Sequence, residues 1–201
     1  MNMSDKTQSS WETFLNPATL RPNLIAASVY ITAFELLKTA IVDRIKSFYT
    51  HGFDRNGGHI DPEYESEVLS RNRSHVFASL EWLKEMQAID DADIAVFERV
   101  KKLRNELAHE LTSILFQGLP ADLVERLTEM ISLLDKIERW WIVNVEIPIN
   151  PDLKGLEINE SRVIPGPIMG LRLLVDIALG SEEESKKHLE GFTKRTRHHS
   201  A

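Results

Sequence analysis

Residues 104–110 read RNELAHE and place an arginine, an asparagine and a histidine within six positions. A histidine imidazole has an unperturbed pKa of about 6.5, so it can accept or donate a proton close to neutral pH. An arginine guanidinium can hold two phosphate oxygens at once, which a lysine ammonium cannot. Arg104 and His109 are therefore suited to acid–base chemistry at a phosphate; the alternative is a solvated helix surface with no role.

The helical wheel places His109 away from the core of its own helix. At about 100° per residue, Arg104 falls at the edge of the apolar stripe, whereas Asn105 and His109 fall on the opposite side. Asn105 and His109 are one turn apart and can touch, and Lys101 and Thr112 share this flank. The apolar stripe consists of Val100, Leu103, Leu107, Leu111 and Ile114. Four cations make the region locally positive: Arg99, Lys101, Lys102 and Arg104.

Apolar residues recur at three- and four-residue spacings through most of the chain, a pattern that predicts helices. Pro22 precedes the first long helix, and Gly118 and Pro120 end the third. The sequence shows no alternating strand pattern, so the predicted fold class is all-α, a bundle of four or five helices. The expected helices span 23–53, 75–86, 90–118 and 121–145, with a short helix through 167–179.

The chain divides into segments of different composition. Pro and Gly are concentrated after residue 146, and an acidic run followed by a basic run ends the chain. We expect the end of the chain to be mobile. The predicted segments are an N-terminal arm (1–22), a helical bundle (23–146), a Pro/Gly-rich C-terminal extension with a short helix (147–181) and a mobile charged tail (182–201).

The amino-acid composition limits the classes of protein to which this chain can belong. The 201 residues suit one compact domain, and the formal net charge of −7 argues against a protein that coats nucleic acid non-specifically. A small basic cleft for one phosphate remains compatible with that charge. The absence of cysteine excludes disulfides and thiolate sites. Without a secretory signal or an apolar stretch of membrane-spanning length, we expect a cytoplasmic protein with no membrane association.

The string R-N-E-L-A-H over residues 104–109 resembles the R-x4-6-H signature of HEPN domains. In that family the position after the arginine is commonly Asn, Asp or His, and Asn105 fits. HEPN domains are helical bundles that carry the motif on one of the later core helices, as expected here. The resemblance covers residues 23–145.

The resemblance implies a homodimer that brings two copies of the motif together as a metal-independent endoribonuclease. His109 would act as base or acid, Arg104 would hold the phosphate, and Asn105 would orient the imidazole or bind phosphate. Lys101, Lys102 and Thr112 would contact the RNA. The family includes toxins and antiviral effectors, some of which work beside a nucleotidyltransferase antitoxin, so we expect an RNA substrate and a partner of that kind.

Two other classes of function stay open. Some HEPN members have lost catalysis and bind RNA, nucleotide or a protein partner. A helical interaction domain with no nucleic-acid role is the third alternative. The acidic net charge keeps the catalytically silent module in consideration.

Further motifs are interpreted as structural. Residues 54–61, DRNGGHID, hold a Gly pair but no phosphate-loop pattern. His51, His59 and Asp61 lack the spacing of metal ligands, so we expect a turn, no metal and no cofactor. Trp140 and Trp141 point about 100° apart on a helix. We expect one in the core and one at an edge, with base stacking on Trp141 as the alternative to packing. The basic run 194–199 is expected to be a solubilising end or a weak RNA attractor.

Overall fold

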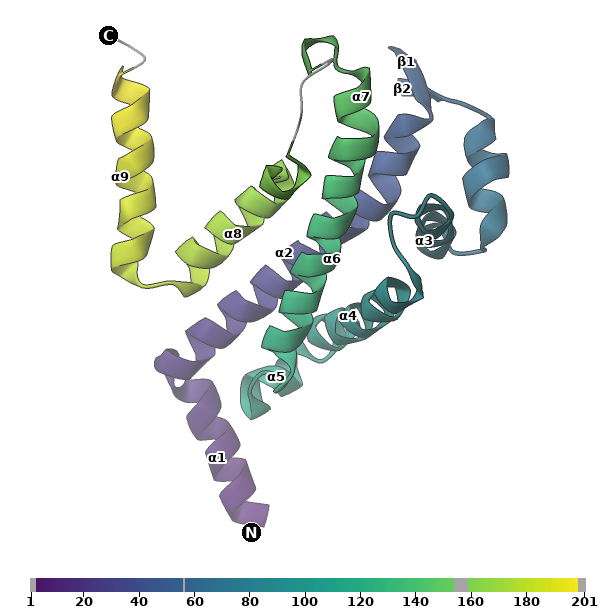
Figure 1. Cartoon of the computed structure of the whole chain (residues 1–201). Coiled ribbons are helices and arrows are strands. Elements are labelled where there is room, and N and C mark those ends of the chain that lie inside the picture. Colours follow the sequence, from purple (N-terminus) through teal and green to yellow (C-terminus); the bar gives the residue numbers. More distant parts are fainter. Residues whose placement is uncertain (1–2, 56, 154–158, 199–201) are drawn as a thin grey trace.

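The structure is a computed structural model that describes residues 3–55, 57–153 and 159–198. A long helix, α2 (Pro17–Phe48), lies at its centre (Figure 1). The side-chain oxygen of Asn16 accepts a hydrogen bond from the N–H of Ala18 at 3.0 Å, and Pro17 lies in the first turn. The expected start at residue 23 is wrong, because Asn16 and Pro17 together are a stronger start signal than Pro22. Pro22 lies inside α2.

Three of the helices that pack against α2 belong to the predicted bundle. These are α3 (His75–Glu85), α4 (Asp91–His109) and α6 (Leu123–Trp141). Buried residues such as Tyr30 and Leu37 face them, and the Tyr30 hydroxyl donates a hydrogen bond to the carbonyl of Val100 at 3.1 Å. Burial raises the pKa of Tyr30. The predicted helices at 75–86 and 121–145 agree with α3 and α6, so the helical bundle is confirmed.

A short β-hairpin follows α2 and corrects the expectation of a fold without strands. Strands β1 (Thr50–Asp54) and β2 (Gly57–Ile60) pair antiparallel. The helix expected to reach residue 53 therefore ends at Phe48. Gly57 has φ +118°, a backbone conformation that glycine adopts without strain. A π-helical turn (Tyr64–Val68) and a 3-10 turn (Leu69–Arg71) lead into α3.

The helix expected over 90–118 is two helices. A capping box between Asp90 and Asp93 starts α4, in agreement with the predicted start. The backbone then turns at Glu110 (φ −111°, ψ 21°), and α5 (Leu111–Gln117) begins on its far side. The residues 104–112 include no Gly or Pro. We attribute the break to the packing of α5 against α1, which no local sequence signal encodes.

The N-terminal segment, expected to be an arm, forms helix α1 (Met3–Leu15). It packs on α5 through an aromatic cluster in which Phe14 and Phe116 stack at 4.6 Å and Trp11 meets Phe116 edge-on at 5.2 Å. Trp11 remains 50% exposed. Figure 1 shows α1 extending away from the N-terminal end of α2.

The C-terminal extension is tied to the bundle by α8 (Gly166–Leu179), which packs on α2 and α6 through buried Ile168 and Leu171. The short helix predicted over 167–179 is thus confirmed. Residues 182–201 were expected to be a mobile tail; Glu182–His198 form helix α9, which packs on α8. Short turns connect α6 to α8: a π-helix (Ile142–Glu146), α7 (Ile147–Ile149) and 3-10 turns at Pro151–Leu153 and Glu160–Arg162.

By length and apolarity alone, α2 could also cross a membrane, and within the described chain it is the one helix that passes this test. Of its most apolar 18-residue window, 50% is buried inside the structure. A helix that is apolar on most faces is also what the centre of a soluble bundle needs. The expected absence of membrane association stays a prediction.

Candidate functional site

Helix α4 holds the motif in place by burying one apolar stripe. Val100 and Leu107 are fully buried and Leu103 is 4% exposed, as the wheel predicts. The motif lies on the last two turns of α4, and His109 is the last residue of the helix. The site therefore combines a rigid helix face with a helix end, and the chain changes direction immediately after the imidazole.

His109 is exposed, in agreement with the wheel, and Asn105 one turn earlier is half-buried. The amide oxygen of Asn105 accepts a hydrogen bond from Nη1 of Arg104 at 3.3 Å. Asn105 is therefore in contact with the arginine of the motif in this structure. Its expected role in orienting the imidazole of His109 stays a prediction.

Arg104 is more deeply engaged than the sequence indicates. Its Nη2 donates to Oε1 of Glu35 on α2 at 2.8 Å, and its guanidinium carbon lies 5.4 Å from the centre of the Phe34 ring. The Arg104 side chain is 30% exposed. The hydrogen bond from Arg104 holds the pKa of Glu35 below its ordinary value. The guanidinium is thus fixed by an ion pair, a ring face and Asn105 together.

The three other residues predicted to contact the substrate have different environments. Nζ of Lys101 lies over the ring of Phe77 on α3, 4.8 Å from its centre. Lys102 is exposed and lies seven residues before His109, on the same face of α4. Thr112 is exposed on α5. The prediction that Thr112 lies on the same flank as Asn105 and His109 assumed one continuous helix. Because the helix breaks at Glu110, the wheel no longer supports that prediction.

Acidic partners neutralise part of the positive strip. Arg99 donates to Glu129 of α6 at 2.8 Å, as Arg104 does to Glu35. No local pattern in the sequence indicates either partner, because both lie on other helices, 30 and 69 residues away along the chain. Lys102 borders a hollow between α4 and the start of α6. The hollow is lined by Arg99, Lys102, Leu103, Glu106, Asp122 and Arg126.

The other sequence candidates lie in the hairpin and near the end of α6. The 54–61 segment belongs mainly to the hairpin, and His51 lies 3.4 Å from Asp61 with its side chain 70% exposed. Across the described chain, no cluster of three or more His, Asp or Glu side chains is placed to hold a metal ion. Trp141 is 3% exposed and stacks on Trp82 at 5.9 Å. Packing of Trp141 is therefore confirmed over base stacking, and Trp140 lies at the edge as expected.

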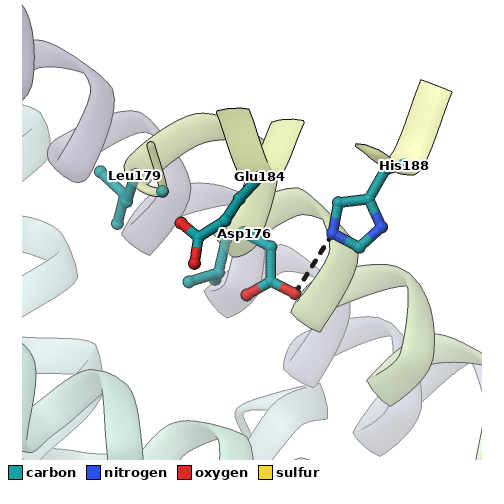
Figure 2. A pocket seen from close by; sticks show the side chains of 6 residues that line it. Asp176, Leu179, Glu184 and His188 are labelled. Atoms are coloured by element: carbon teal, nitrogen blue, oxygen red, sulfur yellow. Dashed lines mark ion pairs between the residues drawn. The ribbon is translucent and has the colours of Figure 1, made fainter. Parts of the chain in front are cut away.

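A hollow between α8 and α9 was not expected from the sequence. Figure 2 shows Asp176 and His188 facing each other across it, with Nε2 of His188 3.8 Å from Oδ2 of Asp176. That distance is longer than a hydrogen bond, and both side chains are well exposed. The Glu184 carboxylate accepts hydrogen bonds from the backbone N–H and hydroxyl of Ser181, which makes it a helix cap. This hollow contains a capping interaction and an ordinary surface ion pair. The basic run 194–199 lies outside the residues whose side chains are described.

Comparison with known proteins identifies no matching family model, no matching curated protein and no matching solved structure. The resemblance to HEPN domains therefore rests on the motif at 104–109 and on the helical bundle that carries it.

Proposed function

We propose that this chain is a HEPN-type, metal-independent endoribonuclease that acts as a homodimer in the cytoplasm. The observation that carries the proposal is the exposed His109 at the end of α4, one turn beyond the hydrogen-bonded pair Arg104 and Asn105. A proton-transfer group and a phosphate-binding group thus share one accessible helix end. A toxin or antiviral effector, restrained by an antitoxin or nucleotidyltransferase partner, is the proposed biological setting.

The proposed reaction requires proton transfer at two oxygens. His109 accepts the proton of the RNA 2′-hydroxyl as the 2′-oxygen attacks phosphorus. The bond from phosphorus to the 5′-oxygen breaks, and that oxygen receives a proton from the partner's His109. The products are a 2′,3′-cyclic phosphate and a 5′-hydroxyl. One imidazole cannot easily serve as base and acid in the same step. A two-fold symmetric dimer provides two copies of His109, one for each proton transfer.

Arg104 stabilises the charge that develops on the phosphate oxygens. Donors aimed at developing charge contribute roughly 2.7–4 kcal/mol each in enzymes where one has been removed. Lys101 and Lys102 add positive charge along the backbone of the RNA, and Asn105 holds Arg104. The Phe34 ring beneath the guanidinium limits the directions in which Arg104 can move.

A catalytically silent HEPN module that binds RNA, nucleotide or a protein is the second candidate. The ion pair between Arg104 and Glu35 favours it, because the guanidinium already has an anionic partner at 2.8 Å. In this alternative Arg104 serves mainly to join α4 to α2.

RNA cleavage in the presence of EDTA distinguishes the two candidates. Purified native chain, His109→Ala and Arg104→Ala are incubated with end-labelled RNA, and the product ends are analysed. Cleavage that leaves cyclic phosphates and is lost in both variants supports the nuclease. His75→Ala is the matched control, because it removes an exposed histidine from α3. Binding of RNA or a partner without cleavage under any condition supports the silent module and contradicts the nuclease.

A further inference from the structure

Glu35 is an acidic side chain that reaches the motif from another helix. It lies on α2, where its Oε1 pairs with Nη2 of Arg104 at 2.8 Å and its Oε2 lies 3.6 Å from Nζ of Lys38. The Glu35 side chain is 45% exposed. Solvent and dissolved anions therefore have access to the ion pair.

Within the described chain, two of the five N–H groups of Arg104 donate to other side chains. Nη2 donates to Glu35 and Nη1 donates to Asn105. Nε is buried and has no hydrogen-bond partner within the part of the chain that the structure describes. A buried N–H without a partner destabilises the folded chain, so the guanidinium gains from an arrangement that pairs Nε. An RNA phosphate that binds where Glu35 binds must therefore displace the Glu35 carboxylate from the guanidinium.

We propose that Glu35 is the positioning residue of the site: its carboxylate holds the Arg104 guanidinium over Phe34 and yields that guanidinium to a phosphate of bound RNA. This role rests on the proposed binding of RNA at Arg104. It makes Glu35 the group that competes with the RNA phosphate for the guanidinium. Glu35 and the phosphate are both anions that accept from the same fork of donors. A phosphate that accepts the Nη2 N–H donated to Glu35 therefore displaces the Glu35 carboxylate, and the charge of Glu35 opposes a phosphate that binds the other N–H groups of Arg104.

The proposal predicts opposite effects on binding and on turnover. Glu35→Gln removes the competing charge, so RNA binds more tightly. It also loosens Arg104, so the rate of the bound complex falls. Because a partly exposed ion pair is weak, we expect the gain in affinity to be about two- to fivefold.

The test measures affinity for 2′-O-methyl RNA, which lacks the attacking hydroxyl, by fluorescence anisotropy at one fixed salt concentration. Glu35→Gln is compared with Arg104→Ala and with the double variant. In the Arg104→Ala background, Glu35→Gln should produce no gain, because the guanidinium for which it competes is absent. Glu98→Gln removes the same charge from an exposed position on α4 and measures the general effect of net charge. Glu35→Asp keeps the charge and should not produce the gain.

Two results overturn the proposal. One is an affinity for Glu35→Gln no higher than that of the native chain, whether or not the native chain binds detectably. The other is a gain that persists in the Arg104→Ala background or equals that of Glu98→Gln. Thermal melting of each variant establishes that it is folded. An Arg104-dependent gain in a chain that never cuts RNA would support the role of Glu35 and contradict only the nuclease.

Discussion

Glu138 on α6 accepts hydrogen bonds from Arg44 on α2, through Nε at 3.3 Å and through Nη2. The Glu138 side chain is 3% exposed, whereas Arg44 is 32% exposed and also pairs with Glu146 in the π-helical turn. The hydrogen bond with Glu138 raises the pKa of Arg44 above its ordinary value. This pair joins α2 and α6 to each other and to the segment that leads into the C-terminal extension.

Removing one member of this pair should destabilise the fold strongly. Glu138→Ala leaves a partly buried guanidinium with only the exposed Glu146. We expect a loss of about 3 kcal/mol in the free energy of unfolding, at the lower end for buried pairs because Arg44 is partly exposed. Urea unfolding measures the loss, and Glu125→Ala on the exposed side of α6 should cost no more than about 0.5 kcal/mol. Equal losses for the two variants would show that Glu138 is not buried as described.

The sequence predicted those parts of the fold whose signals are local. Helix α3, α6 and α8 follow from apolar spacing, and α4 begins at a capping box that its own residues encode. The hairpin was missed because its strands are five and four residues long and show no alternation. The break at Glu110 was missed because no Gly or Pro marks it.

The same distinction holds for the site. The exposure of His109 was predictable because the residues from Val100 to His109 lie on one unbroken helix, so a wheel describes their directions. The position of Thr112 was not, since the chain turns between the two residues. Glu35 lies 69 residues from Arg104, and no local pattern connects two helices that meet only through tertiary packing.

The exposure of His109 makes a prediction about stability that is independent of function. His109→Ala removes no buried contact, so the free energy of unfolding should change by no more than about 0.5 kcal/mol. Leu107→Ala, two residues earlier on the buried stripe, should cost about 2–5 kcal/mol. Urea unfolding of both variants provides the comparison. A large loss for His109→Ala would mean that the imidazole is packed against the protein and unavailable to a substrate.

Glu129 should make the fold sensitive to acid. Its carboxylate accepts from Arg99 at 2.8 Å and from Arg126 at 2.6 Å, and the bond from Arg99 is the main cause of its lowered pKa. A pKa lower in the folded than in the unfolded chain means that the unfolded chain binds more protons. The resulting stability is present above the unfolded value of about 4.3 and is lost as pH falls through the folded value.

Glu129→Gln tests this linkage. The native chain should exceed the variant in unfolding free energy at pH 6, and the difference should shrink as the pH approaches 3. Urea unfolding at both pH values measures the change, with Glu98→Gln on α4 as the control. A difference that is the same at pH 6 and pH 3 would show that the Glu129 carboxylate is not held by the two arginines.

The proposed composite site makes a quantitative prediction for mixed dimers. If each reaction needs His109 from both subunits, activity depends on the square of the native fraction. Native and His109→Ala chains refolded together in equal amounts should then retain about one quarter of the activity of the same total amount of native chain. Independent sites would retain about half. Native chain mixed with His75→Ala should retain full activity, since that histidine lies on α3, outside the motif. A linear decline with the native fraction would locate the entire reaction within one chain and remove the need for the partner's His109.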